Sequence, residues 1–265
     1  MEIPTNRPAV PRVDWLAVGA YYLIACAVSW PFFWWRDMAA ESWRAWQIPN
    51  FLKVASFMWG PGVAALVCFV VFRRRHRRTI TLLGSSPWRS LAFYLIPLAL
   101  LGAFGGHADR FRGFPAAGFI AILAFTSIFG EELGWRGFLQ DALRPLAPWK
   151  RWASIGVLWE FWHFTNRVHS GSWIRIAIVL SISYPAVILL AWIIGKAAEK
   201  SRSVLVATSL HLWVDLVFEA FEGSGEGAGL PAVSALAISI AVWWWLLRGW
   251  PEPRTSIAAA PAALA

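Results

Sequence analysis

The sequence has few charged residues and few cysteines for its length. Only 15% of its 265 residues are charged, whereas 58% are hydrophobic and 20 are tryptophan. This composition is too apolar for a soluble domain of this size and favours an integral membrane protein. Cys26 and Cys68 lie in apolar stretches without a CxxC or Cys/His spacing. They therefore indicate neither disulfides nor a thiolate metal site.

Several catalytic motifs are also missing from the sequence. It contains no HExxH, P-loop or GxGxxG pattern, and its one Ser/Gly stretch, HSGSW at 169–173, has no nucleophile-like setting. Serine catalysis is therefore not expected. We also find no internal repeat, no second domain, and no short apolar core with a cleavage site that would indicate a removable signal peptide.

Apolar windows long enough to cross a bilayer recur along the chain. A bilayer core of roughly 30 Å needs about 20 apolar residues in a helix. The sequence predicts an all-α, polytopic integral membrane protein of about eight transmembrane helices, with a membrane domain at 14–249. A 1–13 tail precedes it, and a Pro/Ala-rich, disordered 250–265 tail follows it. The predicted spans are 14–36, 52–72, 90–106, 115–141, 152–167, 174–195, 203–219 and 231–249.

The basic residues are distributed unequally across these spans. Lys and Arg number 24 against 15 Asp and Glu, which gives a net charge of +9. If the N-terminus is cytoplasmic, 17 of the 24 fall in inner segments, as the positive-inside rule requires. We therefore predict a multi-pass protein of the cell (plasma) membrane with both termini in the cytoplasm. The RRRHRR run at 73–78 is then a topology signal that can touch anionic lipid head groups, and no nucleic-acid partner is expected.

Three clusters of ionisable residues lie inside the predicted spans. Such groups cost about 2.5 to 3.5 kcal/mol each at membrane depth, so their presence indicates function. Counted along helices from the inner loops, all three clusters reach depths of about 10 to 20 Å, so they could share one hydrated cavity. The clusters are Glu131, Glu132 and Arg136; Glu160, His163 and Asn166; and His211 and Asp215.

Helical spacing separates the roles of the two adjacent glutamates. Glu132 and Arg136 are four residues apart and share a face, so they can form a supporting ion pair. Glu131 lies about 100° around the helix from Glu132 and is left for another role. His211 and Asp215 are also four apart and share a face.

These side chains suit peptide hydrolysis by two routes. In one, a glutamate and a histidine hold and deprotonate a water, and a histidine with an aspartate stabilises the oxyanion. In the other, Zn²⁺ bound by histidine nitrogens and carboxylate oxygens generates the hydroxide. The ligands would then be Glu131, His163, His211 and Asp215. A non-enzymatic alternative is a transporter or ion carrier that uses its midplane Glu, His and Asp residues.

Three motifs in the second half of the chain resemble those of a known family. EELGWRGFLQ at 131–140, VLWEFWHF at 157–164 and SVLVATSLHLWVDLV at 203–217 are similar to the EExxxR, FxxxH and HxxxN/D motifs of the CPBP intramembrane proteases. Type II CAAX prenyl endopeptidases and bacteriocin-processing or immunity (Abi) proteins are relatives in that family. The resemblance covers about 114–218, a little under half the chain. Before it, the sequence resembles the family only in having membrane helices.

The resemblance implies an intramembrane endopeptidase, similar to CAAX proteases, that cleaves a membrane-associated protein or peptide. Glu131 would be the water-activating carboxylate, with His163 as its partner, and His211 and Asp215 would form the oxyanion or ligand side. The family is described as metalloproteases, although a metal-free Glu/His mechanism is also argued for it, so both routes stay open. Prenylated substrates, peptide maturation and bacteriocin immunity stay open as well.

Two positions depart from the family motifs. Trp159 takes the place of the aromatic residue in FxxxH and keeps an aromatic wall. Asp215 stands where asparagine is commoner, and an ionised aspartate would repel an oxyanion. We therefore expect Asp215 to be protonated, paired with His211 or bound to a metal. Glu160, three residues before His163, could orient the imidazole or form an interhelical hydrogen bond.

Overall fold

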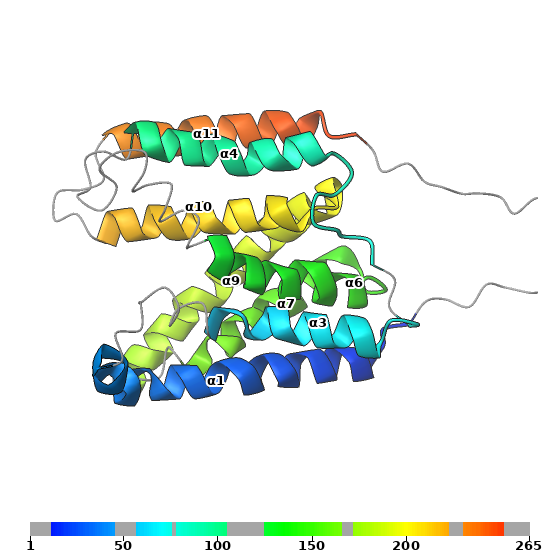
Figure 1. Ribbon diagram of the computed structural model, residues 1–265, viewed down its shortest axis with the longest axis vertical. Helices are drawn as coiled ribbons and strands as arrows, with labels where there is room; N and C mark the ends of the chain where they lie inside the picture. The colour runs from blue at the N-terminus through cyan, green and yellow to red at the C-terminus, as the bar shows by residue number, and fades with distance from the viewer. Residues whose placement is uncertain are drawn as a thin grey trace, which may run out of the picture.

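The computed structural model describes residues 12–45, 57–75, 78–104, 125–165, 172–222 and 230–251, and most of these residues are helical. Within these ranges there is no β-strand, only an isolated bridge between Thr81 and Ser203. The helices (Figure 1) are α1 (Trp15–Ala45), α3 (Gly60–Val71), α4 (Pro87–Phe104), the π-helical turn η2 (Trp135–Leu139), α6 (Gln140–Ala142), α7 (Pro148–Trp162), α9 (Trp173–Ser201), α10 (Val204–Glu222) and α11 (Leu230–Arg248). Residues 125–134 are also helical and continue directly into η2.

These helices overlap the predicted spans, although α1 continues to Ala45, past its predicted end at 36, and the all-α class is confirmed for the described residues. Among those residues, two segments are long and apolar enough to cross a membrane alone, Trp15–Phe32 within α1 and the whole of α9. Eight crossings stay a prediction. The predicted tails lie largely outside the described residues, as do 115–124 of the fourth predicted span. Helix α9 also continues to Ser201, past its predicted end at 195. Its last residues are polar, so they end the apolar window without ending the helix.

Large apolar side chains cover the outside of the bundle. Leu23 of α1, Val70 of α3 and Ile182 of α9 expose 70%, 71% and 66% of their surface. By contrast, Glu131 and Arg136 are fully buried. Soluble monomers rarely expose extended apolar surface to water. An apolar outside with buried charges inside is the arrangement that a bilayer requires.

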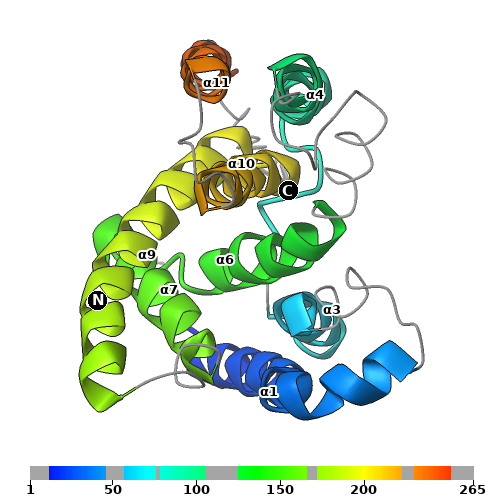
Figure 2. The same cartoon turned by 90° about the vertical axis from the view of Figure 1, so that its left-hand side faces the viewer.

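The helix that contains the first ionisable cluster lies at the centre of the bundle. Residues 125–134, η2 and α6 follow one another as one rod, and α3, α7 and α10 pack around η2 (Figure 2). Helices α4 and α11 pair with each other on the outer side of α10. The rod changes hydrogen-bond register at η2, where the N–H of Gln140 bonds the carbonyl of Trp135. Such π-turns are rare and often occur at functional sites.

Small residues allow α3 to approach the central rod closely. A Cβ added to Gly134 would lie 2.5 Å from Cβ of Pro61, and one added to Gly62 would lie 2.8 Å from the carbonyl oxygen of Gly130. Gly130 and Gly134 are four residues apart, the spacing that lets membrane helices come into backbone contact. This contact fixes α3 against the segment that contains Glu131 and Glu132.

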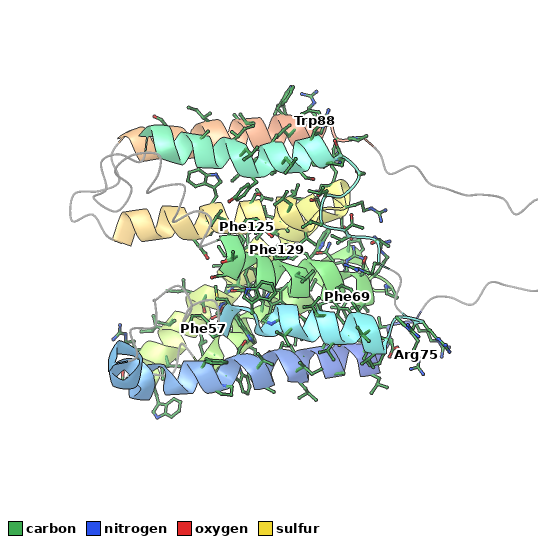
Figure 3. All side chains as sticks on the ribbon, viewed as in Figure 1. Phe57, Phe69, Arg75, Trp88, Phe125 and Phe129 are labelled. Carbon is green, nitrogen blue, oxygen red and sulfur yellow. The ribbon has the colours of Figure 1, made fainter. Side chains whose placement is uncertain are left out.

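The segments that the topology prediction places on the cytoplasmic side of the membrane lie together at one end of the bundle. Arg75, after α3, lies 3.9 Å from Asp14, which precedes α1. Arg89, near the start of α4, donates a 2.8 Å hydrogen bond to the carbonyl of Leu246 near the end of α11. Figure 3 shows Arg75 and Trp88 at this same end, which we call the basic end. The side of the membrane that the basic end faces stays a prediction.

The connection between α3 and α4 folds over the basic end of the rod. The Asp141 carboxylate accepts hydrogen bonds from the backbone N–H groups of Thr79, at 2.6 Å, and Ile80, at 3.2 Å. Two residues further on, Thr81 pairs with the corner between α9 and α10, where Ser203 donates its hydroxyl proton to the carbonyl of Leu82 at 2.9 Å. Asp141 therefore links the rod to the start of α10.

Candidate active site

Glu132 connects the first ionisable cluster to the third. Nη1 of Arg136 donates a hydrogen bond to Oε1 of Glu132 at 2.6 Å, the pairing that their spacing permits. The same oxygen lies 2.8 Å from Nδ1 of His211 on α10. A carboxylate only accepts hydrogen bonds, so Nδ1 is the donor and its proton faces Glu132. This second contact ties α10 to the rod, and spacing alone did not predict it.

Glu131 points toward α7 instead. Nε1 of Trp159 donates a 2.9 Å hydrogen bond to Oε2 of Glu131. The other oxygen, Oε1, is buried and accepts no hydrogen bond from the described residues. Trp159 therefore fixes the orientation of a buried carboxylate and leaves one oxygen available to a further group.

Trp159 is the side chain that the surrounding ionisable groups share. Its ring meets the ring of His211 edge-on at 4.9 Å between centroids and lies 6.2 Å from the ring of His163. The guanidinium carbon of Arg136 lies 4.5 Å from the centre of the indole, within cation–π range. Sequence reasoning assigned Trp159 only an aromatic wall and missed its donor role toward Glu131. The available signal was the change from phenylalanine to tryptophan, because only the indole has an N–H group.

His163 caps the C-terminal end of α7, one turn beyond Trp159. Its ring packs edge-on against Trp162 at 4.7 Å, and its Nδ1 lies 3.8 Å from Oε2 of Glu160. The hydroxyl of Ser183, on α9, donates to the other oxygen of Glu160 at 2.6 Å. Glu160 thus makes the interhelical hydrogen bond that was one of its two expected roles, and it lies beside His163 as the other role requires. Asn166 lies outside the described residues.

Asp215 lies on the far side of His211 from Glu132. Its Oδ2 is 3.7 Å from Nε2 of His211, and 44% of its side chain is exposed. His211 is therefore flanked by two carboxylates, one on each ring nitrogen. Pairing with His211 is one of the three states that the sequence allowed for Asp215.

The nitrogen and oxygen atoms of the candidate site are engaged mainly with one another. Zinc requires three or four nitrogen, oxygen or sulfur ligands that converge on one point. In the part of the chain that the structure describes, no group of three or more His, Cys, Asp and Glu side chains could hold a metal ion. Nδ1 of His211 is engaged by Glu132, and one oxygen of Glu131 is engaged by Trp159. Zinc binding by the protein stays a prediction of the sequence.

Comparisons with known proteins concern the same part of the chain. Residues 113–217 match the family model described as type II CAAX prenyl endopeptidase Rce1-like. The chain is also 28% identical, over 145 residues, to a protein named CAAX prenyl protease 2 from Methanococcus maripaludis. That alignment covers 47% of this chain and 51% of the relative, so the chain spans about half the length of the curated relative it matches. No solved structure matches the chain.

The matched segment contains every residue of the candidate site. It begins before Glu131 and ends just after Asp215, and all three motifs lie within it. Residues 113–217 are therefore similar to the type II CAAX prenyl endopeptidases, in agreement with the resemblance that the motifs indicated.

Proposed function

We propose that the protein is an integral-membrane endopeptidase that hydrolyses a peptide bond in a membrane-associated protein or peptide. The similarity of residues 113–217 to a protease family supports hydrolysis as the reaction class. The observation that carries the proposal is the hydrogen bond from Trp159 to Glu131, which fixes a buried carboxylate against an indole that also contacts the His211 ring. Buried carboxylates held in this way are typical of catalytic sites.

Glu131 is the proposed general base. Its Oε2 is held by Trp159, so Oε1 can bind a water molecule and accept its proton as the water oxygen attacks the peptide carbonyl carbon. His163, next to Trp159, would hold the same water from the other side. When the tetrahedral intermediate collapses, the C–N bond breaks and the proton on Glu131 passes to the leaving amine. The two products are then a new carboxyl terminus and a new amino terminus.

His211 is the proposed group that stabilises the oxyanion. Glu132 accepts from Nδ1 and so orients the ring with Nε2 on the side of Asp215. Nε2 must carry its own proton to donate to the oxyanion, so His211 acts in its doubly protonated form. Glu132 and Asp215 together balance that charge. An ionised Asp215 in this arrangement compensates the imidazolium rather than opposing the oxyanion directly.

The substrate class and membrane orientation extend this proposal. The basic end would face the cytoplasm of a plasma-membrane protein, and the substrate would approach from that end. A prenyl chain could enter laterally between helices, as the name of the archaeal relative suggests. Prenylated peptides and unmodified peptides are therefore the two substrate classes to compare.

Cleavage by the purified full-length chain tests the proposal. The substrates are internally quenched peptides, with and without a farnesylated cysteine near the C-terminus. We expect Glu131→Ala and His163→Ala to lower kcat/KM by at least about 100-fold, and His169→Ala, outside the described residues, to behave like the parent. Equal cleavage by all three variants would remove the assignment. Zinc measured on the same samples tests the metal route, because a stoichiometric ion lost in His211→Ala would support coordination.

A further inference from the structure

Five buried polar atoms beside the glutamate pair have no hydrogen-bond partner among the described residues. They are Oη of Tyr21, Oε1 of Glu131, Oε2 of Glu132, and Nε and Nη2 of Arg136. All four side chains are 0% exposed. A buried polar group that lacks a partner costs free energy, and native proteins satisfy nearly all such groups with protein or ordered water. Orphan atoms on four neighbouring side chains therefore indicate a shared partner.

Tyr21 contributes to this group from outside the family-matched segment. It lies on α1, and its ring meets Trp135 edge-on at 5.7 Å and stacks on Phe138 at 5.2 Å. Trp135 and Phe138 lie on either side of Arg136 in η2, so these ring contacts place Tyr21 against the turn that contains Arg136. Helix α1 thus places a polar group at the centre of the bundle.

The five orphan atoms are chemically complementary. The guanidinium nitrogens of Arg136 can only donate hydrogen bonds, ionised carboxylate oxygens can only accept them, and the Tyr21 hydroxyl can do both. No direct hydrogen bond joins Tyr21 to these residues, since its hydroxyl has no partner in the described part of the chain. Water donates two hydrogen bonds and accepts two, and buried waters typically bind three such groups. A site lined by both donors and acceptors is the kind that holds water rather than staying dry.

We propose that Tyr21, Glu131, Glu132 and Arg136 enclose a buried water site, and that Tyr21 is a positioning residue which holds water against Oε1 of Glu131. The water site itself follows from the unpaired atoms alone. The positioning role rests on the proposed function, because it identifies this water as the one that Glu131 activates. Tyr21 contacts neither the peptide bond nor the leaving group and acts only through the water and Glu131.

Thermal stability of the purified full-length protein tests the water site without any substrate. Tyr21→Phe removes the hydroxyl and keeps both ring contacts, so a water-bonded hydroxyl predicts a melting temperature lowered by about 2 to 4 °C. Removing a hydroxyl that has no partner at all would raise the melting temperature instead. A raised or unchanged value therefore overturns the water site. Tyr22→Phe is the matched control, because it loses a 2.9 Å hydrogen bond to the carbonyl of Leu158 and must lower the melting temperature.

Peptidase kinetics on the same two variants test the positioning role. We expect Tyr21→Phe to lower kcat about fivefold or more with little change in KM, and Tyr22→Phe to keep the kcat of the parent. A lowered melting temperature with an unchanged kcat would overturn the positioning role. A parent protein that cleaves no peptide would contradict the proposed function, while the melting temperature of Tyr21→Phe would still decide the water site.

Discussion

Trp159→Phe is the most informative single substitution in the site. Phenylalanine restores the residue type of the FxxxH motif and keeps an aromatic ring against His211. It removes the indole N–H that donates to Oε2 of Glu131 at 2.9 Å. It also weakens the cation–π contact with Arg136, because tryptophan is the best aromatic partner for a cation. The substitution therefore separates the hydrogen bond that this side chain donates to Glu131 from the packing of its ring against His211.

The size of the effect follows from the hydrogen bond to Glu131. A hydrogen bond to a charged group contributes about 1.5 to 3 kcal/mol, and its loss leaves a buried carboxylate oxygen without a donor. If Glu131 needs this bond to hold its orientation in the transition state, kcat/KM falls by about 10- to 150-fold. Tm falls as well, because Glu131 is fully buried in the folded protein.

The assay compares kcat/KM for the parent and Trp159→Phe on one quenched peptide in the same detergent. Trp192→Phe is the control, because Trp192 lies 41% exposed on α9 and its ring lies 5.3 Å from Nζ of Lys196, a residue that is not part of the candidate site. We expect the control to stay within about twofold of the parent. If Trp159→Phe also stays within that range, Glu131 does not depend on the indole, and the proposed orientation of the base is wrong.

Three further substitutions test the surroundings of the site. Gly134→Ala places a methyl group 2.5 Å from a proline carbon of α3 and should destabilise by about 1 to 3 kcal/mol, whereas Gly19→Ala, with open space at its Cβ, should not lower the melting temperature. Asp141→Asn removes a charged acceptor from the backbone of the α3–α4 connection, so we expect faster hydrogen exchange there and a loss of about 1 to 3 kcal/mol. Arg136→Met removes the cation of a buried ion pair and leaves Glu132 with His211 as its remaining partner, so it should destabilise by about 3 to 5 kcal/mol; adding Glu132→Gln should recover most of the melting temperature without recovering peptidase activity.

The sequence predicted where the helices lie because apolar spans and charged connections differ strongly in composition. The ends of helices were predicted less well, as α9 shows. The residues beyond the predicted end include Lys196, Glu199 and Lys200, which end an apolar window but favour a helix. Glu199 also pairs with Arg151 of α7, a contact that stabilises this turn only in the folded bundle.

Contacts within one helix were predictable, and contacts between helices were not. The Glu132–Arg136 pair follows from a spacing of four residues. The bond from Trp159 to Glu131 joins residues 28 apart, and the bond from His211 to Glu132 joins residues 79 apart. Both depend on how α7 and α10 pack on the central rod, which a single sequence does not specify.

The change of register at η2 was also beyond sequence reasoning. A helical pattern of 3.6 residues per turn assumes that every backbone bond spans four residues. At η2 the N–H of Gln140 reaches the carbonyl of Trp135, five residues back, so side chains beyond it are rotated from their expected faces. Tyr21 was overlooked for a different reason, because an isolated tyrosine in an apolar span is indistinguishable from a packing residue until its neighbours are known.

An experimental structure of the full-length Glu131→Gln variant with a bound peptide substrate tests the central claim most directly. The account predicts that the scissile carbonyl lies between residue 131, His163 and His211, with its oxygen directed at Nε2 of His211. It also predicts ordered water beside the carboxamide at position 131. A peptide bound elsewhere, or His163 and His211 directed away from residue 131 toward lipid, would contradict it.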